Sequence, residues 1–160
     1  ILITLKKDYF STIILKDKNM KKSILFGLFF MLTSIMFGQS PIGTWKTIDD
    51  ETKQAKSYVE IFEKDGKLYG KVIMILTKGK ENAKCTDCTG ALKNKPIVGM
   101  QILSGLKKDG KEWNGGKIID PNNGKEYKAK MSLNGSDKLD VRGYIGISLV
   151  GRTQTWQRVK

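Results

Sequence analysis

Apolar and polar residues alternate in short stretches through residues 40–160, and turn-forming residues separate these stretches. The clearest case is residues 127–133, where Tyr, Ala, Met and Leu occupy the odd positions and Lys or Ser the even ones. A period of two is typical of a half-buried β-strand, because successive side chains of a strand point to opposite faces. We predict strands at residues 42–48, 57–63, 67–77, 97–106, 113–119, 125–133, 139–144 and 152–159.

The segments between these strands have the composition of tight hairpins. Asp-Gly pairs stand at residues 65–66 and 109–110, and such pairs are strong hairpin signals. In the central hairpin, Pro121 fixes φ in an Asp-Pro-Asn-Asn-Gly turn. A longer polar loop is expected at residues 78–95. About eight short strands, with no convincing amphipathic helix, predict an all-β barrel or sandwich.

Residues 20–39 are organised as a secretory signal peptide. Met20 and two lysines precede an apolar run at residues 23–37, and small residues follow it. The run is shorter than the ~20 apolar residues of a spanning helix, and no cysteine for lipid attachment follows it directly. We therefore expect an exported protein, periplasmic or secreted, with no stable membrane anchor after the signal-peptide helix is removed.

Residues 1–19 fit nothing downstream. The chain begins with Ile1, whereas a natural start with a complete signal peptide stands at Met20. We predict that residues 1–19 are a non-native upstream extension; a genuine but disordered extension is the alternative. Residues 40–160 form a chain of a length that suits one domain.

The positive charge of the chain indicates a solvated surface. The formal charge is +13, and six lysines against two aspartates place +4 in residues 1–39, which leaves +9 for residues 40–160. Lysine supplies nearly all of it and is scattered, as on a soluble sheet exterior. Nucleic-acid sites cluster arginine with aromatic residues, so no nucleic-acid partner is expected. Arg142, Arg152 and Arg158 are the only arginines, which suggests that each is used for its planar shape.

The chemistry-bearing residues argue against catalysis. The chain has no histidine, which removes the usual general base and the commonest metal ligand. Cys85 and Cys88 match a redox spacing, but they lie in a polar loop rather than at the start of a helix. Outside the cytoplasm, a structural disulfide is the expected outcome, and an oxidoreductase is the weakest functional hypothesis. We expect no enzyme activity, no catalytic residue, no metal and no cofactor.

Several motifs resemble a bacterial secreted family, the domain of unknown function 2147. They are Gly43-Thr44-Trp45, the run WNGGKIIDPNNGKEY at residues 113–127, VRGYIG at 141–146 and GRTQTWQR at 151–158. The resemblance implies a small antiparallel lipocalin-like up-and-down β-barrel of about eight strands. It also implies that a basic residue of the last strand packs over Trp45, with Arg158 the best match and Arg152 the reserve. The family brings no catalytic residues.

A barrel of this size either fills with side chains or holds one small ligand. Aromatic and basic residues that could meet a ligand are Tyr69, Trp113, Tyr127, Arg142 and Tyr144. Glycines at 70, 115, 116 and 143 stand near them and leave space on one face. Alternation divides the 139–144 strand into a Leu139/Val141 face and an Arg142/Tyr144 face, without showing which faces the lumen. The leading hypothesis is a carrier of a small amphipathic or apolar molecule. The alternative is an envelope interaction module with a solid core, which uses the 78–95 loop as its contact surface.

Overall fold

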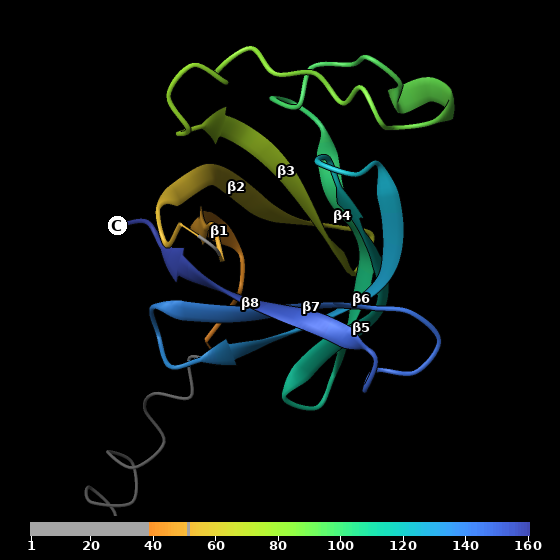
Figure 1. Ribbon diagram of the computed structural model, residues 1–160. Helices are drawn as coiled ribbons and strands as arrows, with labels where there is room; N and C mark the ends of the chain where they lie inside the picture. The colour runs from red at the N-terminus through yellow and green to blue at the C-terminus, as the bar shows by residue number, and fades with distance from the viewer. Residues whose placement is uncertain (1–38, 51) are drawn as a thin grey trace, which may run out of the picture. The chain divides into compact units, whose positions relative to one another are not determined.

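The computed structural model describes residues 39–50 and 52–160. The predicted upstream extension, and the predicted signal peptide except for Gln39, lie outside the described residues. Within the described part, eight strands form a closed barrel in which each strand pairs antiparallel with the next and β8 returns to β1 (Figure 1). The strands are β1 Gly43–Ile48, β2 Ala55–Lys64, β3 Lys67–Ile75, β4 Gln101–Asp109, β5 Glu112–Asp120, β6 Lys125–Asn134, β7 Lys138–Tyr144 and β8 Gly151–Arg158. The predicted all-β, up-and-down barrel is confirmed.

The predicted fourth strand was placed too early in the chain. Residues 97–100 belong to the connection before β4, because Ile97 bonds to the loop and both Gly99 and Met100 bond to the single residue Val72 of β3, so no regular ladder forms there. The Ile97 amide donates to the Ala83 carbonyl at 3.0 Å, and the Gly99 amide donates to the Val72 carbonyl at 2.7 Å; both distances are ordinary for such bonds. The strand then continues three residues further than predicted, to Asp109.

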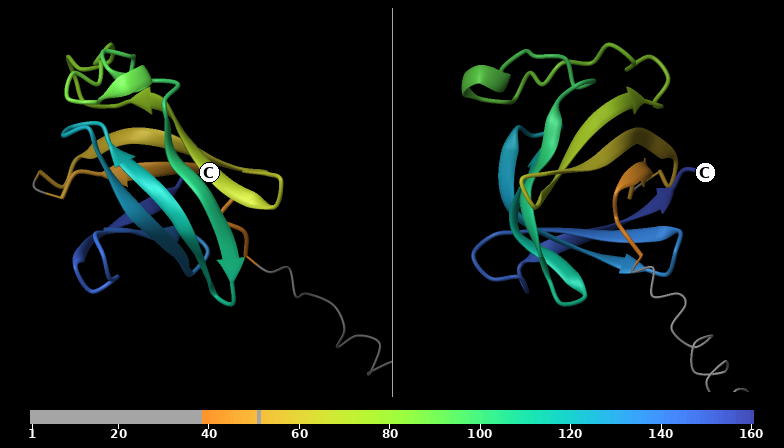
Figure 2. Two further views of the ribbon diagram at one scale, coloured as in Figure 1. Left: turned by 90° about the vertical axis from the view of Figure 1, so that its right-hand side faces the viewer. Right: turned by 180° about the vertical axis from the view of Figure 1, so that it is seen from behind.

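The two ends of the barrel differ in their connections. One end carries the short turns after β2, β4 and β6, together with both ends of residues 39–160. The other end carries the longer connections around residues 50, 76–100 and 145–150 and the turn at 121–124. The left view of Figure 2 shows the latter group along its left side. We call these the closed end and the open end, respectively. Among the described residues, no helix has the length and apolarity needed to cross a membrane.

The closed half of the barrel is packed solid. Its interior holds large buried side chains from every part of the sheet, among them Trp45, Ile61, Leu68, Leu106, Trp113, Met131 and Leu139. Glycines let these side chains interdigitate: a Cβ on Gly116 would lie 2.5 Å from Leu106 Cγ, and one on Gly70 would lie 3.0 Å from Leu103. The space that these two glycines leave is therefore occupied by leucine, which is the close packing expected of a small β core.

Candidate ligand-binding cavity

The closed end is sealed by an arginine stacked on a tryptophan. The Arg158 guanidinium carbon lies 4.2 Å from the centre of the Trp45 ring, and Trp45 is fully buried. The guanidinium also donates to the carbonyls of Ser136 at 2.8 Å, Ile42 at 3.2 Å and Ser40 at 2.7 Å. The indole Nε1 donates to the Pro41 carbonyl at 2.7 Å. The predicted contact between Arg158 and Trp45 is thus confirmed, and it ties the first strand, the last strand and the β6–β7 turn together.

Arg152, the reserve candidate for this contact, lies at the open end instead. Its guanidinium pairs with the Asp50 carboxylate. The same carboxylate accepts a hydrogen bond from Gln154 Nε2 at 3.0 Å. These contacts fasten the start of β8 to the β1–β2 connection.

The open half of the barrel contains a cavity of about 1350 Å³ that opens to solvent at its mouth; every strand contributes to its wall. Its deep part is apolar and includes Val72, Ile102, Ile118, Val141 and Trp156. These five side chains come from β3, β4, β5, β7 and β8. The strands continue from these residues into the packed core of the closed half. The floor of the cavity is therefore apolar and rests on close-packed side chains.

Buried polar side chains in the cavity wall have hydrogen-bond partners, and two pairs of them bond to each other. Thr47 Oγ1 and Ser57 Oγ lie 2.8 Å apart across the β1–β2 ladder, and Trp156 Nε1 donates to Gln154 Oε1 at 3.5 Å. Among the described residues, no buried side-chain nitrogen or oxygen lacks a hydrogen-bond partner. A guest molecule therefore does not have to satisfy a stranded polar group, and burial of its apolar surface is the main source of affinity that this wall offers.

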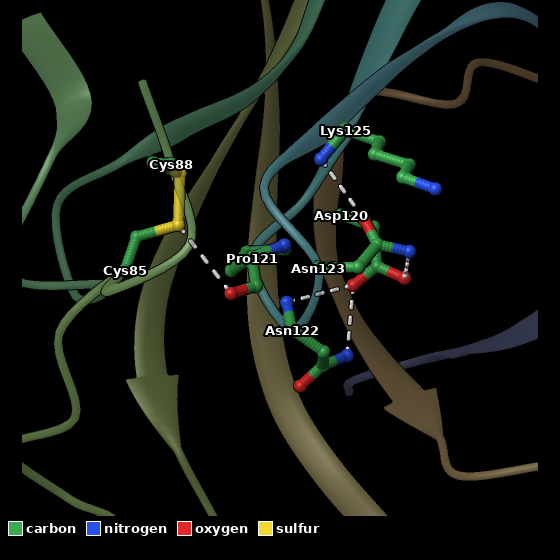
Figure 3. The surroundings of a disulfide bond; sticks show 7 residues. All are labelled: Cys85, Cys88, Asp120, Pro121, Asn122, Asn123 and Lys125. Carbon is green, nitrogen blue, oxygen red and sulfur yellow. Dashed lines mark hydrogen bonds between the residues drawn. A yellow bond between two sulfur atoms is a disulfide. The ribbon is translucent and has the colours of Figure 1, made fainter. Parts of the chain in front are cut away.

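The rim beside β5 and β6 is built by the Asp-Pro-Asn-Asn-Gly turn (Figure 3). Asp120 Oδ1 accepts hydrogen bonds from the Asn122 backbone amide at 3.0 Å and from its side chain at 2.8 Å. Asn123 Nδ2 lies 3.2 Å from the Tyr127 hydroxyl, and Asn123 Oδ1 accepts from the Lys125 amide at 2.9 Å. This turn thus contributes one hydrogen bond, from Asn123, to Tyr127 at the cavity wall.

A disulfide organises the polar segment that covers part of the mouth. We call residues 78–95 the disulfide segment. Cys85 and Cys88 are bonded and buried, which confirms the predicted disulfide. The Cys85 amide donates to the Lys95 carbonyl and its carbonyl accepts from the Asn94 amide, both at 2.9 Å. Because the sulfur atoms are shielded from solvent, they are poorly placed for the thiol exchange that an oxidoreductase requires.

The disulfide segment rests directly on the β5–β6 turn. Cys85 Sγ lies 3.4 Å from the Pro121 carbonyl oxygen (Figure 3). Gly124 has φ of +67°, and a Cβ there would lie 2.6 Å from the Cys88 amide nitrogen and still closer to the Asp87 backbone. The two chain segments therefore meet backbone to backbone, and residues 79–84 of the disulfide segment reach the cavity.

Charged groups of both signs surround the mouth, including Lys56, Lys80, Lys84 and Asp120. The Glu81 carboxylate accepts hydrogen bonds from its own backbone amide and from the Gly79 amide at 3.0 Å, which lower its pKa below the ordinary 4.5. Glu81 is therefore ionised at neutral pH. Within the described residues, no three His, Cys, Asp or Glu side chains gather as metal ligands would.

The structure brings two of the five predicted ligand-contacting residues to the cavity. Tyr127 and Tyr144 line it. Tyr69 lies on the outer surface of β3, where its ring stacks on Phe62 with the centroids 5.8 Å apart. Trp113 is buried, but it belongs to the closed half and not to the cavity lining.

Arg142 faces away from the lumen. Leu139 and Val141 are buried on the inner face of β7, so Arg142, between Val141 and Gly143, projects outward. Its guanidinium donates to the Ser148 carbonyl at 2.7 Å, the Leu149 carbonyl at 3.1 Å and Thr153 Oγ1 at 2.8 Å. The condition under which Arg142 would orient a ligand, an inward-pointing face, is therefore not met.

Sequence reasoning missed most of the cavity lining. The missed residues are chiefly aliphatic or small and polar: Thr47, Ser57, Val72, Ile102, Ile118, Val141 and Gln154. Alternation was the signal that could have found most of them, because each except Ile102 faces the same side of its strand as a buried neighbour. The predicted residues are mostly large and aromatic, whereas aliphatic and polar side chains make up most of the cavity wall.

Comparison with known proteins agrees with this architecture. No match was found among proteins of curated function. A solved structure, protein HP1028 from the human pathogen Helicobacter pylori, which is described as belonging to the lipocalin family, is similar with a TM-score of 0.67. The two chains are 27% identical, and the match covers 76% of this chain and 84% of that one. Residues 43–158 match the model of the family DUF2147, described as an uncharacterized protein conserved in bacteria, and the chain belongs to that family.

Proposed function

We propose that this protein is an exported, non-enzymatic carrier that holds a small amphipathic or apolar molecule in the open half of its barrel. The observation that carries the proposal is the cavity of about 1350 Å³, apolar at its floor and polar at its rim. Small-molecule sites are typically concave, mostly apolar and furnished with a few polar groups. The lipocalin description of HP1028 supports the same class of function by analogy.

The gradient of polarity indicates how a guest would lie. Its apolar part would contact Val72, Val141 and Trp156, and its polar part would remain near Tyr127 and the Asp120 turn. Burial of apolar surface supplies about 25 cal/mol per Å² removed from water. Hydrogen bonds at the rim would then determine the orientation of the guest and contribute less to its affinity. The solid-core alternative describes the closed half of the barrel only, so we do not adopt it for the whole molecule.

Export rests on the signal-peptide pattern at residues 20–39, and the absence of enzyme activity rests on the lack of histidine. Neither argument depends on the cavity. Both the proposed location and the proposed role can therefore be tested separately.

Native mass spectrometry tests the binding proposal. Protein purified from its own envelope should carry a non-covalent adduct that is lost on denaturation. Val141→Phe, which extends a side chain into the cavity, should abolish the adduct, and Ile118→Phe provides a second filled lumen. Val98→Phe makes the same change at an exposed loop position and should leave the adduct in place. Loss of the adduct in all three variants, or its persistence in the two filled ones, would refute a lumenal site.

A further inference from the structure

The β7–β8 loop, residues 145–150, concentrates exposed apolar side chains at the cavity mouth. Among the described residues, eight large hydrophobic side chains are exposed, and four of them are Ile145, Ile147, Leu149 and Val150. Their exposed fractions are 65%, 63%, 83% and 62%, whereas none of the other four exceeds 50%. Single exposed apolar residues are ordinary, but four within six positions mark an interaction site.

We propose that this loop inserts into the surface of an anionic lipid membrane. The loop projects from the barrel wall between β7 and β8 (Figure 1). A short projection of this kind suits the interfacial region of a bilayer, into which apolar side chains sink by several ångströms. A stable protein interface takes roughly 500 Å² or more from each partner, so area alone does not choose between a lipid and a protein partner, and the choice rests on the charge around the loop.

The carbonyl groups of the loop are paired within the protein. Each carbonyl oxygen from Gly146 to Val150 accepts a hydrogen bond from within the protein. The donors and distances are Lys128 Nζ to Gly146 at 3.4 Å, the Val150 amide to Ile147 at 3.1 Å, Arg142 Nε to Ser148 at 2.7 Å, Arg142 Nη2 to Leu149 at 3.1 Å, and the Ile145 amide to Val150 at 3.0 Å. Carbonyls left without donors would oppose transfer into a lipid interface. This pairing removes that penalty for the carbonyls. It also shows what Arg142 does in place of ligand contact: it bonds to the loop.

Charge selects the kind of lipid. Residues 40–160 carry a formal charge of +9, and cationic side chains flank the loop: Lys128 bonds to it, and Arg142 lies on β7, which leads into it. Basic residues close to an anionic bilayer draw the protein to its surface within a Debye length. The apolar tips then supply the short-range part of the binding.

Docking in this orientation would place the cavity beside the membrane. Ile145 and Val150 belong to both the loop and the cavity lining, so an amphipathic guest could pass between lipid and lumen with little exposure to water. This route rests on the proposed carrier function. Membrane docking itself does not, because the exposed side chains and the paired carbonyls are present whatever the lumen holds.

Sedimentation with lipid vesicles tests the inference, using residues 40–160 and vesicles of phosphatidylethanolamine with phosphatidylglycerol. The wild-type protein should bind them, bind more weakly in high salt, and bind phosphatidylcholine vesicles poorly. The Ile147→Ser/Leu149→Ser variant changes only highly exposed side chains, and its affinity should fall by about tenfold or more, because much of the inserted apolar surface is lost. The Met74→Ser/Val98→Ser variant removes two exposed apolar side chains elsewhere and should bind like the wild type.

Three outcomes would overturn the proposal. The first is the absence of wild-type binding to anionic vesicles. The second is equal binding by the wild type and the loop variant, which would mean that lysine charge alone attracts the protein. The third is a wild-type dimer that the loop substitutions convert to a monomer, which would assign the loop to self-association. The lumenal adduct should survive the loop substitutions, so failure of docking and failure of carriage give different results.

Discussion

Arg158 and Trp45 meet at 4.2 Å across the seam where β8 closes onto β1. The barrel has no free sheet edge there, and the arginine bonds to three carbonyls of the chain around that seam. One side chain therefore contributes ring stacking and local hydrogen bonding at the same end of the molecule.

Arg158→Lys should lower the free energy of unfolding by about 1–3 kcal/mol. The lysine ammonium is not planar, so it cannot stack on the Trp45 ring, and it cannot reach all three carbonyls at once. Urea unfolding of residues 40–160 would measure this. Lys111→Arg, the converse change at an exposed turn, is the control and should have little effect. If both substitutions have the same small effect, the stacked pair does not stabilise the closed end.

The strands could be predicted from the sequence because their signals are local. Alternation and turn pairs indicated that eight strands exist, since each depends on residues close together in the chain, and the family resemblance then favoured a barrel over a sandwich. The fourth strand was misplaced because residues 97–100 look like a strand in composition. Their amide partners, Ala83 and Val72, are chosen by the tertiary structure, which no local pattern records.

The site was predicted less well, for a geometrical reason. A strand's alternation defines two faces but not which one is inside; for β7 this left Arg142 as a ligand candidate, although Val141 is the lumenal residue. The hollow and the solid halves also cannot be separated along the chain. The space beside Gly116 and Gly70 is occupied by Leu106 and Leu103 of a neighbouring strand, whereas Gly143 lies at the cavity.

Gly124→Ala should destabilise the protein more than Gly66→Ala does. The two glycines have nearly equal φ, +67° and +68°, so both substitutions incur the left-handed penalty of about 1 kcal/mol. A Cβ at Gly66 meets nothing within 4 Å, whereas one at Gly124 collides with the backbone of the disulfide segment. An additional loss of roughly 1–3 kcal/mol is expected for Gly124→Ala. Equal losses of stability in thermal or urea unfolding would show that the disulfide segment moves to accommodate the Cβ without a further loss of stability.

Changing both Cys85 and Cys88 to Ala should cost about 2 kcal/mol, because the closed ring is short. Hydrogen exchange should locate the effect at the disulfide segment and the β5–β6 turn that it rests on. Alkylation of the secreted wild-type protein without reductant should add no mass. A modified thiol, or unfolding of the whole barrel in the double variant, would contradict a disulfide whose role is local.

Expression from Met20 in a bacterium should give a mature protein that begins between Gln39 and Pro41. The basic start, the short apolar run and the small residues after it predict cleavage there. Intact mass and N-terminal sequencing of the envelope fraction would show the cleavage site. Uncleaved protein recovered in the membrane would mean that residues 20–39 act as an anchor.

Arg142→Gln separates a role in the loop from a role in ligand contact. Glutamine is too short and has too few donors to replace the bonds to Ser148, Leu149 and Thr153 together. We therefore expect faster amide exchange across residues 145–150, with a loss of stability of about 1–2 kcal/mol. Since the guanidinium faces away from the lumen, a guest bound deep against Trp156 should still be retained as an adduct. Gln157→Ala, on an exposed position of β8, is the control and should leave the exchange of the loop unchanged. Arg142 would instead be a ligand residue if its substitution removed the adduct while the loop kept its wild-type protection.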